Sequence, residues 1–100
     1  MIDYKKINEY VASMITKSES YCKLTSIAID DLLGSKSQHI TEKDLHDGIE
    51  YLIAKNKKEV EENHYASDVQ KEYEKNRREI IFKSIEEDIK SYLKRQNRLK

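Results

Sequence analysis

Proline is absent from this chain of 100 residues, and glycine occurs only at positions 34 and 48. These two residue types supply the backbone conformations that tight turns, hairpins and phosphate-binding loops require. Turn-rich β-folds and glycine-rich nucleotide-binding loops are therefore disfavoured. The sequence predicts an all-α fold.

The first third of the chain carries apolar residues with the spacing of one helix face. They recur mainly at intervals of three, four or seven residues, as side chains on one side of an α-helix do: Ile7, Tyr10, Val11, Met14, Tyr21, Leu24, Ala28 and Leu32. The pattern predicts one helix over about residues 3–33, ended by Gly34. The polar stretch 16–20 leaves an alternative open, a break near Ser18, because serines also cap new helices.

A second helix is predicted to begin after Thr41. The Thr41 hydroxyl can cap the first turn, and Glu42 and Asp44 suit the positive end of the helix dipole. Its inward face comprises Leu45, Gly48, Ile49, Leu52, Ile53, Asn56 and Val60. A mid-helix glycine costs about 1 kcal/mol relative to alanine, so we interpret Gly48 as a point of close approach by a neighbouring helix.

A third helix is predicted over about residues 67–97, after a turn near residues 63–66. Ser67 and Gln70 have the spacing of a capping box. The helix carries two apolar stripes offset by one residue, which is about 100° of rotation: Val69, Tyr73, Asn76 and Ile80 on the first, and Ile81, Ile85, Ile89 and Tyr92 on the second. The two halves should therefore face different neighbours, or the helix should bend near residues 80–82.

Charge is distributed unevenly along a chain of zero net charge. Residues 1–40, 41–76 and 77–100 carry 0, −4 and +4 respectively. Fourteen of the 26 residues from 54 to 79 are charged, which leaves too few apolar side chains for an independent core. We expect a single domain over residues 1–100, with three or four antiparallel helices in a small bundle from which the 54–79 region projects as a charged hairpin.

No group of residues predicts catalysis. Glu42, His46 and Glu50 share one helix face at metal-ligand spacing, but such spacing arises readily by chance in so charged a helix. Cys22 lies beside Lys23, which favours a thiolate, but no histidine stands at a recognisable catalytic spacing. We therefore expect no catalytic residue, no metal and no cofactor, and a protein that is not an enzyme.

Protein binding is the predicted function. The chain has seven tyrosines and no tryptophan, and tyrosine suits interface positions where the ring is buried and the hydroxyl stays in water. The charged hairpin has few apolar side chains against which Tyr65 and Tyr73 could pack. Val69 and Asn76 share the stripe of Tyr73, and polar interruptions at Asn56 and Asn76 are of the kind that sets register in helical oligomers. The expected protein is a small regulator, inhibitor, antitoxin or immunity-type protein that occupies the surface of another protein or of a second copy.

Nucleic-acid binding is the alternative. Lys90, Lys94, Arg95 and Arg98 form a basic run near the C-terminus, although cations also suit the last turns of a helix. A helix-turn-helix reading is disfavoured, because the loop at residues 35–40 is long and acidic residues at the front of the next helix repel phosphates. The single cysteine, the lack of a long apolar run and the lack of a secretory signal at the N-terminus predict a cytoplasmic protein without a membrane span.

Overall fold

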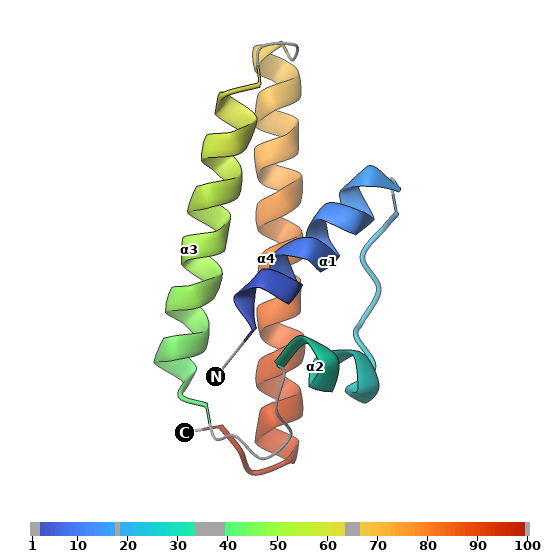
Figure 1. Cartoon of the computed structure of the whole chain (residues 1–100), viewed down its shortest axis with the longest axis vertical. Helices are drawn as coiled ribbons and strands as arrows, with labels where there is room; N and C mark the ends of the chain where they lie inside the picture. Colours follow the sequence, from blue (N-terminus) through green and yellow to red (C-terminus); the bar gives the residue numbers. More distant parts are fainter. Residues whose placement is uncertain (1–2, 18, 34–39, 64–66, 100) are drawn as a thin grey trace.

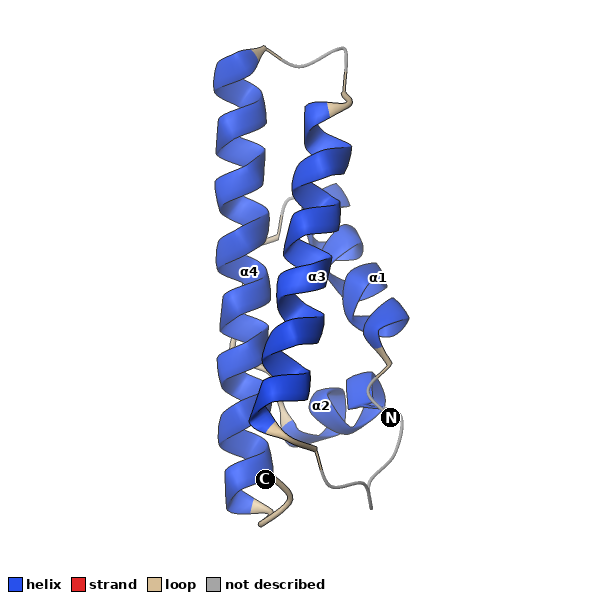
Figure 2. Ribbon diagram, turned by 90° about the vertical axis from the view of Figure 1, so that its left-hand side faces the viewer, coloured by secondary structure: helices blue, strands red, loops and turns tan. Residues whose placement is uncertain are grey.

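The computed structural model describes residues 3–17, 19–33, 40–63 and 67–99. They form four α-helices, α1 (Tyr4–Thr16), α2 (Ser26–Leu33), α3 (Glu42–Glu61) and α4 (Asp68–Arg95). The two long helices, α3 and α4, run antiparallel as the main packed pair, and α1 and α2 lie across one side of it (Figures 1 and 2). The predicted all-α bundle is confirmed, with four helices.

The single first helix predicted over residues 3–33 is wrong, and the alternative break near Ser18 is correct. Helix α1 ends at Thr16, and α2 begins only at Ser26, where the Thr25 hydroxyl accepts a hydrogen bond from the Ala28 amide at 3.2 Å. The non-helical residues 19–25 between them, here called the strap, run along the outside of the bundle (Figure 1). Serine-rich sequence permits this break, and contacts with α4 hold it.

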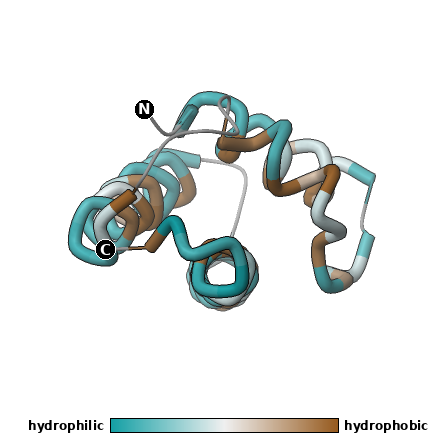
Figure 3. The backbone as a smooth tube through the Cα atoms, turned by 90° about the horizontal axis from the view of Figure 1, so that it is seen from below, coloured by the Kyte–Doolittle hydropathy of each residue, from teal (hydrophilic) through white to brown (hydrophobic). Residues whose placement is uncertain are grey.

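One hydrophobic core draws on all four helices. Helix α3 turns its hydrophobic side inward and its hydrophilic side outward (Figure 3). Removing one such side chain fully from water contributes about 1.5–3 kcal/mol, so the core is the main source of stability. Its fully buried members are Ile7, Val11, Ile29, Leu33, Leu45, Ile49, Phe82, Ile85, Ile89 and Leu93.

The predicted starts of α3 and α4 are confirmed at the level of hydrogen bonds. The Thr41 hydroxyl accepts from the Asp44 amide at 3.1 Å. Ser67 and Gln70 form the complete capping box, with each side chain accepting from the other residue's amide. Both caps satisfy amides that the first turn of a helix leaves unpaired.

The charged ends of α3 and α4 project beyond α1, as predicted (Figure 1). Their side chains pair across the hairpin: Lys57 with Glu79 at 3.0 Å, and Lys75 with Glu61. Val60 adds a buried apolar contact. In this hairpin, α3 and α4 are therefore joined by ion pairs as well as by a small number of apolar contacts.

The chain after α4 turns back toward the start of α3. Asn97 adopts a left-handed φ of 57°, and the amide of Arg98 donates to the Leu93 carbonyl at 2.9 Å, the arrangement of a Schellman cap. The Ile40 amide then donates to the Arg98 carbonyl at 3.0 Å. No helix in the described part of the chain is both long enough and apolar enough to cross a membrane.

Candidate protein-interaction surface

The first apolar stripe of α4 faces solvent. Val69, Tyr73 and Ile80 are 80%, 65% and 64% exposed, and Asn76 between them is exposed as well. We call these four residues the outer stripe. The second stripe, which begins at Ile81, is buried in the core. The one-residue offset seen in the sequence therefore separates a core face from a solvent face on a continuous helix.

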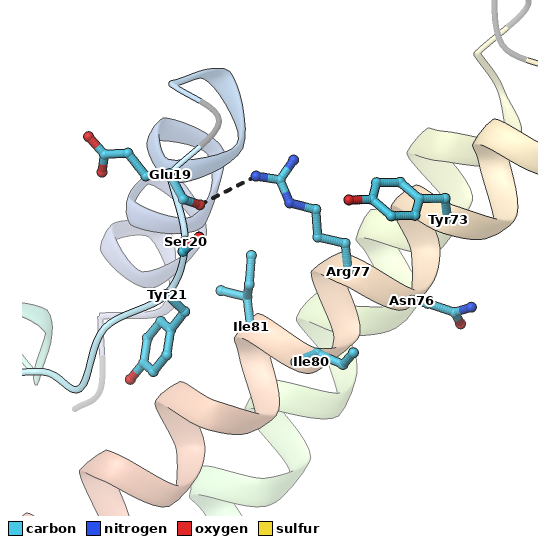
Figure 4. A pocket seen from close by; sticks show the side chains of 8 residues that line it. All are labelled: Glu19, Ser20, Tyr21, Tyr73, Asn76, Arg77, Ile80 and Ile81. Carbon is cyan, nitrogen blue, oxygen red and sulfur yellow. Dashed lines mark hydrogen bonds between the residues drawn. The ribbon is translucent and has the colours of Figure 1, made fainter.

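An open groove lies between the outer stripe and the strap. It has a volume of about 710 Å³ and is lined by Glu19, Ser20, Tyr21, Tyr73, Asn76, Arg77, Ile80 and Ile81. Figure 4 shows the ring of Tyr73 directed toward the Arg77 side chain and the strap crossing opposite them. A second hollow, lined by Tyr21, Ile80, Lys83, Ser84, Glu87 and Asp88, continues along α4. The exposed side of α4 is thus hollowed over several turns.

Asp88 holds the strap against α4. One of its carboxylate oxygens, Oδ2, accepts hydrogen bonds from the Tyr21 hydroxyl and from the Leu24 amide, the latter at 2.9 Å. Burial, and then the hydrogen bond to Asp88, raise the pKa of Tyr21 far above its ordinary value. A second contact is donated by Arg77 to the Glu19 carbonyl at 3.4 Å (Figure 4). The wall of the groove therefore depends on two α4 side chains for which the sequence offered no signal, because Asp88 lies 64 residues from Leu24.

Four residues were predicted to bind a partner. The structure places three of them on one face of α4, and the fourth lies outside the described residues. Val69, Tyr73 and Asn76 lie on the outer stripe, whereas Tyr65 lies outside the described residues. Ile80, which the sequence placed on the same stripe but not among the binding candidates, completes the surface. Its signal was the continued spacing of four residues beyond Asn76.

Asn56 is buried inside the chain, which corrects the expectation that it sets register between copies. Its amide nitrogen donates to the Asn8 side chain at 2.9 Å and to the Leu52 carbonyl at 2.8 Å. Its oxygen accepts from Arg78 at 3.1 Å. These bonds join α1, α3 and α4, so Asn56 serves the fold.

The basic run of the nucleic-acid alternative does not form one exposed face. Arg98 is 7% exposed and lies 3.7 Å from the carboxylate of Asp30. Lys90 pairs with Glu42 at 3.1 Å. Lys94 and Arg95 are the exposed members of the four. Two exposed cations give a weaker electrostatic attraction for phosphates than four would.

The residues considered as metal ligands or as a nucleophile make other contacts or are exposed. Glu42 contacts Lys90, and His46 Nδ1 lies 3.1 Å from Glu86, while Glu50 is exposed. Within the described ranges no three His, Cys, Asp or Glu side chains gather as metal ligands would. Cys22 is an exposed free thiol on the strap.

The chain matches no protein-family model, no curated protein and no solved structure. The geometry of its own surface is therefore the guide to its function. The outer stripe combines three exposed apolar side chains with an adjacent groove.

Proposed function

We propose that this protein is a non-enzymatic protein-binding module that acts by occupying a partner's surface, as a small regulator, inhibitor, antitoxin or immunity-type protein does. The observation that carries the proposal is the outer stripe, in which three large apolar side chains on one helix face are each at least 64% exposed. Tyr73 and Ile80 also line the same groove, and exposed apolar side chains gathered on one face are typical of interaction sites.

The composition and rigidity of the stripe support this proposal. Tyr73 offers an aromatic ring with a polar tip, the residue type enriched at interfaces. The stripe region of α4 is held against α3 by the ion pairs of Lys57 with Glu79 at 3.0 Å and of Lys75 with Glu61, and by the hydrogen bond from Arg78 to Asn56 at 3.1 Å. A partner would meet a preformed surface, so little conformational entropy is lost on binding.

Other exposed apolar side chains lack these features. Ile27 on α2 is 84% exposed and Tyr51 on α3 is 66% exposed, but each stands as a single large exposed hydrophobic residue on its helix. Isolated exposed apolar residues are normal on protein surfaces. Nucleic-acid binding has less support, because Arg98 is buried and Lys90 is paired. The expected compartment is the cytoplasm, in keeping with the single cysteine.

Affinity capture from the native host tests the proposal with a matched pair of variants. Tyr73→Lys places a charge in the outer stripe, and Tyr51→Lys makes the same change at a tyrosine of nearly equal exposure on α3. Neither substitution should unfold the chain, because exposed changes usually alter stability by less than about 0.5 kcal/mol. Far-UV circular dichroism and thermal unfolding check this.

A third variant, Ile80→Lys, places a charge at a second position of the outer stripe. We expect the tagged wild-type chain and Tyr51→Lys to retain the same partner, and Tyr73→Lys and Ile80→Lys to lose it. Quantitative mass spectrometry should show a loss of about tenfold or more, since a buried unpaired charge at an interface costs at least 1.4 kcal/mol. Equal recovery of every protein by all four chains would overturn the proposal.

A further inference from the structure

We propose that the outer stripe binds a second copy of this chain, with the two α4 helices parallel and in register over residues 69–80. This inference rests on the proposed function and specifies its partner. The contact would be a short two-stranded coiled coil built on the solvent face of α4, N-terminal to the buried residues of the helix, which begin at Ile81.

The spacing of the outer stripe is that of a coiled-coil seam. Val69, Tyr73, Asn76 and Ile80 are separated by four, three and four residues, the alternation that left-handed coiled coils use. In a parallel pair each side chain meets its own counterpart, so Val69, Tyr73 and Ile80 form like-with-like apolar layers. Asn76 occupies a d position of this seam, so its pair of asparagines lowers the stability of the contact, and the register is set by the charges that flank the stripe.

Charges beside the stripe complement each other in the parallel arrangement. Glu72 and Arg77 lie five residues apart, about 140° around the helix, on opposite sides of the stripe. The two-fold axis of a parallel pair runs along the helices, so opposite sides meet. Glu72 of each copy then faces Arg77 of the other, and two ion pairs close the contact.

Both groups are placed to make this contact. The Glu72 side chain is exposed. Arg77 contacts Glu74 at 3.7 Å and the Glu19 carbonyl at 3.4 Å, and its five N–H donors exceed these two contacts. Because Arg77 lines the groove, Glu72 of the second copy would enter the groove from its open side.

An antiparallel pair that overlaps the whole stripe lacks this complementarity. Its two-fold axis runs across the helices, so the same side of each helix meets. Glu72 would then lie nearest Glu79 of the other copy, and Arg77 would lie nearest Gln70. Like charges in close opposition are unfavourable, so the flanking residues select the parallel orientation.

The next two seam positions limit the contact. They are Lys83 and Glu87, which would meet their own like-charged counterparts in a parallel pair. At the other end, α4 begins at Asp68. An interface of about three helical turns is smaller than a standard one, so we expect a reversible dimer with a Kd in the range of about 1–100 μM.

Single cysteines test the orientation in the full-length chain with Cys22→Ser as background. Val69→Cys and Ile80→Cys should each form a disulfide-linked dimer on mild oxidation, because each position meets its own counterpart at disulfide distance. Tyr51→Cys, at an equally exposed site on α3, is the control and should not cross-link appreciably. Cross-linking only in a mixture of Val69→Cys with Ile80→Cys would show an antiparallel pair and overturn the proposal.

Charge exchange tests the register independently by sedimentation equilibrium. Glu72→Arg and Arg77→Glu should each weaken self-association about tenfold, because two ion pairs become two like-charge contacts. An equal mixture of the two variants should recover it, since every Glu–Arg contact is then restored between unlike chains. No change in either variant, or no recovery in the mixture, contradicts the proposal.

These results also separate the two proposals. A wild-type chain that stays monomeric at millimolar concentration, while Tyr73→Lys still loses a captured partner, would overturn the second-copy inference and leave the proposed function standing. If neither self-association nor capture depends on the outer stripe, both proposals are wrong.

Discussion

At the scale of single residues, Gly48 shows how the absence of a side chain positions a helix. A Cβ atom at this position would lie 2.0 Å from the ring carbon Cε1 of Tyr4. The Tyr4 hydroxyl donates to the Asp44 carbonyl at 2.8 Å, so the ring lies across the backbone of α3. The predicted close approach at Gly48 is confirmed, and the contact is made by a side chain of α1.

Gly48→Ala should therefore change the free energy of unfolding of the wild-type chain in two opposite ways. In a chain without the Tyr4 ring, only one of these two effects should remain. Alanine gains about 1 kcal/mol of helix propensity, but it displaces Tyr4 and breaks a hydrogen bond of comparable value. In a Tyr4→Ala background only the gain remains. Urea unfolding of the four chains should give a coupling free energy of about 1 kcal/mol or more, and an equal effect of Gly48→Ala in both backgrounds would contradict the contact.

Asn56 and Asn76 illustrate what one residue type can mean at two positions. Both interrupt an apolar stripe of the sequence. Asn56 is 6% exposed and bonded to three helices, whereas Asn76 is exposed on the outer stripe. A stripe of polar and apolar residues indicates a contact face, but not whether the contact lies within a chain or between chains.

At the scale of elements, the strap depends on a hydrogen-bond acceptor that is distant in sequence. Asp88 accepts from both Tyr21 and the Leu24 amide. Leu24 itself is buried in the core. The strap is therefore held by one buried apolar side chain, by the Asp88 carboxylate and by the hydrogen bond from Arg77 to the Glu19 carbonyl.

Removal of the Asp88 carboxylate should release the strap without unfolding the bundle. Asp88→Ala leaves the Leu24 amide and the Tyr21 hydroxyl unpaired, which costs about 1–3 kcal/mol. Amide hydrogen exchange at Leu24 should accelerate about tenfold or more, while amides of α3 keep their protection. Asp31→Ala, which removes an exposed carboxylate paired with Lys6 at 3.3 Å, is the control, and unchanged exchange at Leu24 in Asp88→Ala would contradict the anchoring role.

At the scale of the whole molecule, tyrosine hydroxyls connect elements that are distant in sequence. Tyr4 links α1 to α3, Tyr21 links the strap to α4, and Tyr92 of α4 donates to Asp30 of α2 at 2.6 Å. Burial raises the pKa of Tyr4 and Tyr21, and the hydrogen bond to Asp30 raises the pKa of Tyr92. Each of these links requires the neutral phenol as donor.

Stability should therefore fall as the pH rises above about 10, the ordinary tyrosine pKa. Below that pH both states hold the phenol protons, and the contribution is fully present. At higher pH the unfolded chain releases them first, so the contribution is lost as the pH approaches the raised folded-state pKa.

Urea midpoints measured between about pH 8 and pH 11 test this linkage. Lysine side chains titrate in the same range, so the comparison is with Tyr21→Phe. That variant lacks the Tyr21 phenol with its raised pKa, so its free energy of unfolding should fall less steeply as the pH rises. Identical slopes in the two chains would contradict the link between Tyr21 ionisation and folding.

Local chemistry let the sequence by itself determine the all-α class, the caps at Thr41 and Ser67, and the spacing of the two α4 stripes. A cap involves groups within three residues, and a stripe follows from helix periodicity alone. Three outcomes were decided only by the tertiary structure: the break between α1 and α2, the burial of Arg98 beside Asp30, and the exposure of the Val69–Ile80 stripe. Each depends on which surfaces meet when distant segments pack, and periodicity carries no information about the neighbour.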